Sequence, residues 1–108
     1  MSAEIAFTDL HAFRRDLLYA VRTLERDEPP KGLAVKQHLE ADYGETINHS
    51  RLYQNLDELV ERGLLAKGKK DDRTNEYQTT ETARALLEAA TKRRANALGL
   101  AVEGGAER

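Results

Sequence analysis

The stretch NHSRLYQNLDELVERGLLAKGKKDDRTNEYQT, residues 48–79, decides the fold of this 108-residue chain. It opens with Asn48, a favourable helix N-cap, and its apolar residues then recur at steps of three or four up to Val60. Gly63 ends this helical pattern, and two short segments rich in strand formers follow around a charged turn. The stretch therefore predicts an amphipathic helix from His49 to about Arg62 and then a β-hairpin.

Two further helices are predicted before this stretch. Apolar residues spaced three and four apart form one helical face from Leu10 to Leu24, ahead of a double proline. A shorter pattern predicts a second helix, about Leu33 to Tyr43, which Gly44 can terminate. The linker of residues 45–47 is brief, so the second and third predicted helices form a helix-turn-helix arrangement.

A last helix is predicted after Thr80, another suitable N-cap. Its apolar stripe extends beyond what one small domain needs to cover, and we expect it to pair with a second copy of the chain. The alternative is a terminal helix that folds back on its own core. The residues expected in the dimer interface are Leu86, Leu87, Ala90, Ala97 and Leu98.

The order helix, helix, helix, strand, strand, helix predicts a winged helix-turn-helix, a mainly α (α+β) fold. It comprises three helices, a two-stranded β-wing and a C-terminal dimerisation helix. We expect a DNA-binding domain over residues 1–80, the dimerisation helix over residues 81–102 and a disordered tail over residues 103–108.

The composition excludes several classes of protein. There is no cysteine, which excludes disulfides and thiolate metal sites, and no apolar run approaches the ~20 residues of a membrane span. The first residues lack the pattern of a signal peptide, so we expect a cytoplasmic protein with no membrane partner. The net charge of −2 means that a DNA-binding surface requires charge to be sorted between faces.

The outer face of the third predicted helix carries residues suited to reading bases. With the leucines facing inward, Ser50, Arg51 and Gln54 point outward in the first two turns, and Asn55 lies on a flank. Arg can bind guanine through two hydrogen bonds, and Asn or Gln can bind adenine. The acidic second half of the helix would be repelled by phosphate, so base reading is expected only near the helix start. The alternative is an ordinary solvated helix face.

The hairpin carries a concentration of positive charge that suits phosphate binding. The alternative is an exposed turn that charge merely keeps soluble. The residues expected to contact the DNA backbone are His49, Tyr53, Lys67, Lys69, Lys70 and Arg73.

The sequence contains few of the patterns that are typical of enzymes. The three histidines, His11, His38 and His49, lie on three different predicted helices without metal-ligand spacing. Glycine-rich phosphate loops are missing, and adjacent acidic residues diverge, which suits acid–base chemistry poorly. We therefore expect no enzyme, no metal and no cofactor.

The segment RLYQNLDELVERGLL, residues 51–65, resembles the recognition helix of PadR-type transcriptional regulators, whose pattern is roughly L-Y-x-x-L-x-x-L-x-x-x-G-L. Arg73–Tyr77 resembles the second wing strand, and Arg14–Leu18 resembles the opening helix of small archaeal members. The resemblance covers about Phe7 to Leu98. The sequence departs from the family at two places: Gln54 stands where many members have proline or a small residue, and Thr79–Ala83 replaces the family's Leu-Thr-x-x-Gly entry to the last helix. The matching residues are Leu52, Tyr53, Leu56, Leu59, Gly63 and Leu64.

The resemblance implies a homodimeric repressor of transcription that binds a pseudo-palindromic operator in double-stranded DNA. It also implies a dimer formed through the C-terminal helix, often packed with the first. Some members take aromatic effectors, but no pattern in this sequence indicates such a ligand. Two alternatives stay open: a low-specificity protein that coats or partitions DNA, and a winged-helix module that binds proteins.

Overall fold

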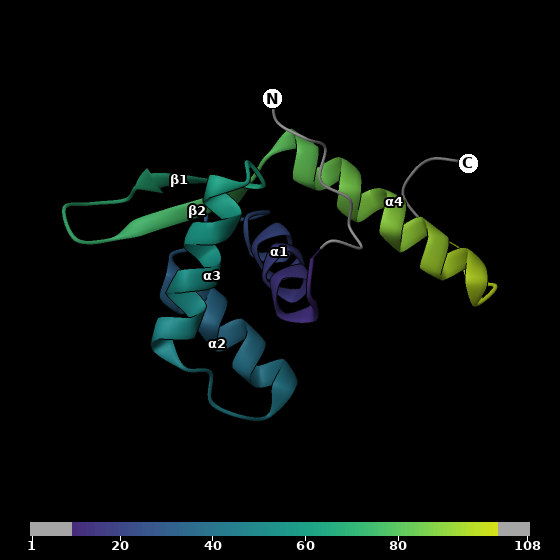
Figure 1. The fold of residues 1–108 in the computed structure, drawn as a ribbon, viewed down its shortest axis with the longest axis horizontal. Helices are drawn as coiled ribbons and strands as arrows, with labels where there is room; N and C mark the ends of the chain where they lie inside the picture. The colour runs from purple at the N-terminus through teal and green to yellow at the C-terminus, as the bar shows by residue number, and fades with distance from the viewer. Residues whose placement is uncertain (1–9, 102–108) are drawn as a thin grey trace.

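The computed structural model describes residues 10–101, and the predicted tail of residues 103–108 lies outside them (Figure 1). The expected order of elements is confirmed, and with it the winged helix-turn-helix fold. The elements are α1 (Ala12–Leu24), α2 (Gly32–Tyr43), α3 (His49–Glu61), β1 (Leu65–Lys69), β2 (Asn75–Thr79) and α4 (Glu81–Ala97).

Local signals in the sequence set most helix ends. Asn48 caps α3, its side chain accepting a hydrogen bond from the backbone N–H of Arg51 at 2.9 Å. Thr80 caps α4 in the same way, and Gly44 follows α2 in the left-handed conformation, with φ of 73°. Helix α1 starts two residues later than the apolar pattern, because His11 is its N-cap; Leu10 is buried but precedes the helix.

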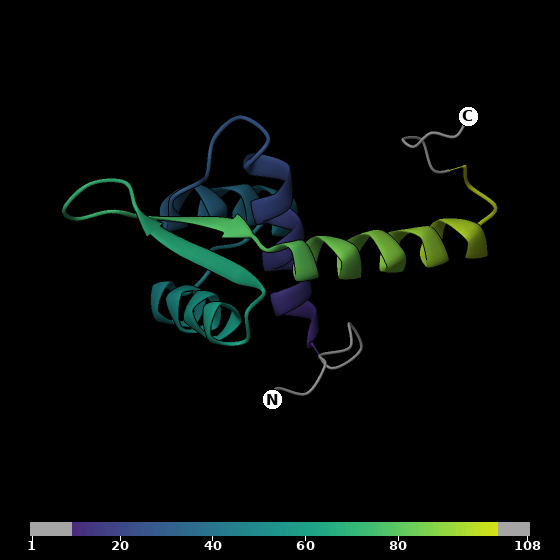
Figure 2. The same cartoon turned by 90° about the horizontal axis from the view of Figure 1, so that it is seen from above.

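The wing is an antiparallel hairpin whose register pairs Leu65 with Thr79 and Lys69 with Asn75. The segment before α2 joins it, since the backbone N–H of Tyr77 donates to the carbonyl of Pro30 at 2.9 Å. Both figures show the hairpin projecting from the helical body, with α4 on the other side (Figures 1 and 2). The base of the wing is thus attached to the body, while its tip extends away from it.

One hydrophobic core unites residues from every helix and both strands. Helix α4 contributes Ala83, Leu87 and Ala90 to this core, all of them buried. The expectation that Leu87 and Ala90 belong to a dimer interface is therefore wrong for these two residues, because their own chain covers them. Leu86 packs partly buried against the same core. The first half of α4 thus belongs to the body of the domain.

The second half of α4 extends past the body, as Figure 2 shows. Ala97 is exposed, and Leu98 keeps 73% of its surface accessible. Leu100, just beyond the helix, is 58% exposed. Within residues 10–101, the structure contains no helix of the length and apolarity needed to cross a membrane.

Candidate nucleic-acid interface

The outer face of α3 presents Ser50 and Gln54 to solvent, as expected. The opposite face is buried through Leu52, Leu56 and Leu59, each 0% exposed. Helical periodicity therefore predicted the direction of these two polar side chains correctly. Both lie in the first two turns, at the end of the helix that helix-turn-helix proteins direct toward base edges.

Arg51 is exposed but lies at the side of α3 that faces α1. Its guanidinium carbon is 3.9 Å from the ring centre of Phe13, a cation–π contact with a residue near the start of α1. Arg51 thus occupies the edge of the outward face rather than its centre.

Asn55 does not lie on the exposed surface, contrary to the expectation that it reads bases. Only 9% of its surface is accessible, and both polar atoms of its side chain are occupied. Its Oδ1 accepts a hydrogen bond from Arg14 Nε at 2.8 Å, and its Nδ2 donates to the carbonyl of Arg51 at 2.8 Å. The sequence showed Asn55 on a flank of the helix but not that α1 covers that flank.

The other flank of α3 faces α2 and the wing. The rings of His49 and Tyr53 lie side by side with centroids 4.6 Å apart. Tyr53 packs directly over Gly32, where an added Cβ would come within 2.5 Å of its ring. The sequence showed no reason for glycine at this position, because the reason is a contact between two helices.

A groove of about 310 Å³ separates the start of α2 from the wing. Tyr53 and Arg73, two residues expected to contact the DNA backbone, both line this groove. The residues that line it are Lys31, Gly32, Leu33, Tyr53, Arg73, Thr74 and Asn75.

The lysines of the wing differ in the ion pairs that they form. Lys67 Nζ lies 3.2 Å from Asp57 Oδ1 of α3, and Lys70 Nζ lies 3.9 Å from Glu28 Oε2. These side chains are well exposed, so each pair contributes little and can exchange its carboxylate for a phosphate. Lys69 shares the face of Lys67, because the two are two residues apart on one strand.

The tip of the wing is shaped by Asp71. Its Oδ1 accepts a hydrogen bond from the backbone N–H of Arg73 at 2.9 Å, a local turn typical of aspartate. This bond, with contacts to Thr74 and the charge of Lys70, lowers the pKa of the Asp71 carboxyl below its ordinary value. The carboxylate therefore holds the turn that presents the neighbouring cations.

The acidic second half of α3 is partly neutralised by neighbours. Glu58 pairs with Arg62 at 3.1 Å, and Asp57 pairs with Lys67. Glu61 is exposed on the same half. The acids of α3 and the cations of the wing thus meet at the Asp57–Lys67 pair, so the expected sorting of charge between faces is incomplete there.

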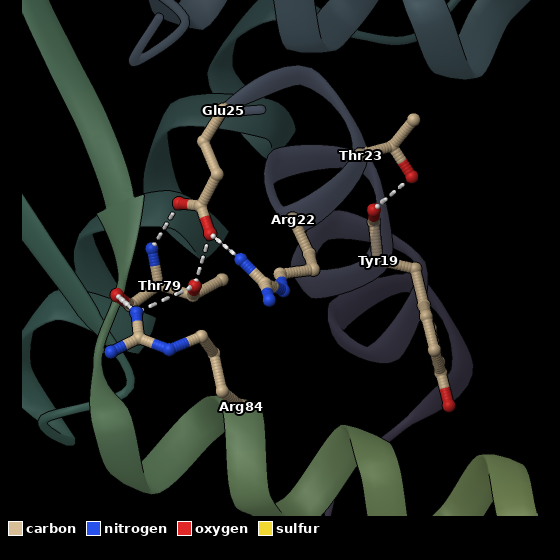
Figure 3. A network of polar contacts seen from close by, with 6 residues as sticks. All are labelled: Tyr19, Arg22, Thr23, Glu25, Thr79 and Arg84. Carbon is tan, nitrogen blue, oxygen red and sulfur yellow. Dashed lines mark hydrogen bonds and ion pairs between the residues drawn. The ribbon is translucent and has the colours of Figure 1, made fainter. Parts of the chain in front are cut away.

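The base of the wing is fixed by a polar network that the sequence did not reveal (Figure 3). The side chain of Glu25 is 8% exposed and follows directly after α1. It accepts hydrogen bonds from Thr79 N at 2.8 Å, Thr79 Oγ1 at 2.5 Å and Arg22 Nη1 at 3.0 Å. Arg84 of α4 donates to the Thr79 carbonyl at 2.7 Å. Helix α1, strand β2 and helix α4 are thereby joined at one point.

Within residues 10–101, no group of three or more His, Cys, Asp or Glu side chains is placed to hold a metal ion. The three histidines lie apart on different elements, at the N-cap of α1, in α2 and at the start of α3.

Comparison with known proteins gives consistent matches. The model of the transcriptional regulator PadR-like family matches residues 21–89. RosR from H. salinarum is 40% identical, with a TM-score of 0.70 over 86% of this chain and 82% of RosR. A PadR family regulator from Eggerthella lenta DSM 2243 is 27% identical, with a TM-score of 0.58 over 81% of this chain and 76% of its own.

A more distant likeness concerns the fold alone. A MarR mutant from E. coli, complexed with operator DNA, is 19% identical, with a TM-score of 0.68 over 85% of this chain and 61% of MarR. Among curated proteins, no sequence matches this chain significantly.

The fold, the polar face of α3 and these matches define a winged-helix, DNA-binding transcriptional regulator. The chain belongs to the PadR-like family, whose model covers more than half of it. This membership confirms the resemblance noted in the sequence. It also confirms the expectation that the chain is no enzyme, because regulators of this family are non-enzymatic DNA-binding proteins.

Proposed function

We propose that this protein is a cytoplasmic repressor that binds a pseudo-palindromic operator as a homodimer. The observation that carries the proposal is the position of the polar start of α3 beside the cationic wing. Ser50 and Gln54 are exposed there, and Arg51 stands at the edge of the same surface. These residue types can hydrogen-bond base edges in the major groove. Ser50, Arg51 and Gln54 are therefore the proposed base-reading residues.

The DNA backbone is proposed to bind on the wing side of α3. Lys69 is exposed at the far end of β1, and Arg73 lines the groove between the wing and α2. Phosphates of the DNA can replace the exposed carboxylates that face Lys67 and Lys70. Tyr53 lines the same groove from α3, with the ring of His49 beside it. Binding of this kind releases counterions, so it should depend strongly on salt.

The proposed dimer forms through the second half of α4. Ala97 and Leu98 are exposed there, and Leu100 extends the apolar surface beyond the helix end. A two-fold dimer places two copies of α3 on successive major-groove faces, which matches a pseudo-palindromic site. The repressing role rests on the resemblance to PadR-type regulators, and occupation of an operator is sufficient to produce it.

Gel-shift titration of the full chain against genomic fragments at several salt concentrations tests DNA recognition. We expect one fragment or a few to be retained at moderate salt. Uniform weak binding to all fragments, lost together as salt rises, would support a DNA-coating protein instead. Failure to retain any fragment at low salt would favour a protein-interaction module and contradict the proposal.

Sedimentation analysis of Leu98→Asp tests the dimer separately. Burial of a charge in an apolar interface is costly, so we expect this variant to be monomeric where the parent chain is dimeric. Leu33→Asp is the matched control, because Leu33 is also exposed, at 43%, but lies on α2. A Leu98→Asp chain that stays dimeric would place the interface elsewhere.

A further inference from the structure

Arg51 is held by neighbours at three separate points. Its backbone N–H donates to Asn48 Oδ1, its carbonyl accepts a hydrogen bond from Asn55 Nδ2, and its guanidinium lies over the ring of Phe13. The side chains of Ser50 and Gln54 are exposed, and within residues 10–101 they make no hydrogen bond, ion pair or ring contact. Arg51 is therefore the base-reading candidate whose position depends most on the rest of the fold.

The contacts to Asn55 and Phe13 reach the same short segment of α1. Phe13 and Arg14 are neighbours in sequence, and Arg51 and Asn55 are one helical turn apart on α3. Phe13 contacts the guanidinium of Arg51, and Arg14 Nε donates to Asn55 Oδ1 at 2.8 Å. Two adjacent residues of α1 thus bind two residues on one side of α3.

The side chain of Asn55 connects helix α1 to the backbone of α3. It is nearly buried, and its two polar atoms connect Arg14 of α1 with the backbone of Arg51. A buried amide that loses either partner leaves a polar atom unsatisfied, which disfavours other placements of α3 against α1. The link therefore restricts how the start of α3 can shift or rotate.

Phe13 restricts the side chain of Arg51 without consuming its hydrogen-bond donors. The ring is buried, at 4% exposure, so it is a fixed platform beneath an exposed cation. A cation–π contact orders a flexible guanidinium before any ligand arrives. Its N–H groups stay available for an acceptor, and less ordering is left to be done on binding.

We propose that Asn55 and Arg14 are positioning residues for DNA recognition, which hold Arg51 of α3 against the Phe13 platform of α1. The inference rests on the proposed contact between Arg51 and DNA and adds the residues that place it. A recognition side chain must be held close to its productive geometry by such supporting contacts. Asn55 then influences sequence preference without touching a base.

A double-mutant cycle tests this assignment in the full-length chain. The variants are Arg51→Ala, Asn55→Leu and the pair combined, each titrated against the retained fragment and against variants with single base-pair changes. Gln37→Leu is the matched control, because it makes the same kind of change at an exposed position on α2. If Asn55→Leu unfolds, Asn55→Asp replaces it in the cycle, because aspartate retains an oxygen that can accept from Arg14. Thermal melts measure the folding of every variant.

We expect Arg51→Ala to lower discrimination at one base pair by roughly 5- to 150-fold, the range for a bidentate contact. Asn55→Leu should lower discrimination at that same base pair, by at least about 5-fold. In the Arg51→Ala background it should add less than about 2-fold, because it acts through Arg51. Gln37→Leu should leave discrimination unchanged.

The outcomes separate this inference from the proposed function. If Arg51→Ala lowers discrimination but a folded Asn55→Leu or Asn55→Asp chain does not, the positioning role is wrong and base reading by Arg51 stands. If both substitutions weaken binding to all DNA sequences equally and their effects do not add, the positioning role is supported. Arg51 would then contact the DNA backbone and not a base. Full additivity of the two substitutions overturns the inference, as does a chain whose binding is indifferent to Arg51.

Discussion

The base and the tip of the wing are built in different ways. At the base, Thr79 is hydrogen-bonded to the nearly buried carboxylate of Glu25 and to Arg84 of α4 (Figure 3). Thr79 also pairs with the buried Leu65 across the hairpin. At the tip, Lys69 and Lys70 are exposed and a local turn around Asp71 provides the shape. The base contains buried, satisfied polar groups, whereas the tip contains charges that face water.

The base of the wing therefore orients the hairpin, whereas the tip is available to bind DNA. Buried contacts determine the direction in which the hairpin leaves the body, because unsatisfied polar groups there are costly. Exposed cations contribute little to folding but remain available to phosphate. Substitutions at the base should therefore change stability, and substitutions at the tip should change DNA affinity.

The largest expected effect follows truncation of the core at the base. Leu65→Ala removes a side chain that is 2% exposed, and should lower the free energy of unfolding by about 2–5 kcal/mol. Lys69→Ala, at the opposite end of β1, should change it by less than about 0.5 kcal/mol. Urea unfolding followed by circular dichroism measures both. Similar values for the two variants would contradict the division between base and tip.

A smaller loss should follow removal of the carboxylate that joins α1 to the wing. Glu25→Ala leaves the N–H and hydroxyl of Thr79 without their acceptor, at a cost of about 1–3 kcal/mol in unfolding free energy. Glu28→Ala is the matched control, because its side chain is 74% exposed and only loosely paired with Lys70. A stability change of equal size in the control would show that the network at the base is dispensable.

Lys70→Ala should change DNA binding and leave stability nearly unaltered. We expect weaker binding to all sequences alike, and a plot of log affinity against log salt that is shallower by about 0.9 for each phosphate that is no longer neutralised. Fluorescence anisotropy at a series of salt concentrations measures this slope. Lys92→Ala, an exposed lysine on α4, should keep the parent slope. A selective weakening on one sequence would mean that Lys70 reads bases.

The smallest expected effect is the pH dependence of the tip. Because the pKa of Asp71 is lowered in the folded chain, its carboxylate stabilises the turn above the ordinary pKa of 3.8. This contribution disappears as the pH falls through the lower, folded pKa. The amide signal of Arg73 in NMR spectra should follow the transition, and Asp71→Ala should abolish it. A midpoint at or above 3.8 would contradict the stabilising role.

The sequence alone determined the order of elements and most of their ends. Caps such as Asn48 and Thr80 and the left-handed Gly44 act within a few residues of themselves, so their effect can be inferred from local sequence. Periodicity likewise predicted the outward direction of Ser50 and Gln54. The family resemblance rested on the same local pattern, and the family match supports it.

The tertiary structure decided which element packs against each side of a helix. Asn55 is buried because α1 packs on its side of α3, and Leu87 and Ala90 are buried because the first half of α4 packs on the core. Glu25 meets Thr79 across 54 positions of chain. Helical periodicity assigns a residue to a side of its own helix, but burial depends on which element packs there. Contacts between distant segments therefore decided which polar residues stabilise the fold and which remain available to DNA.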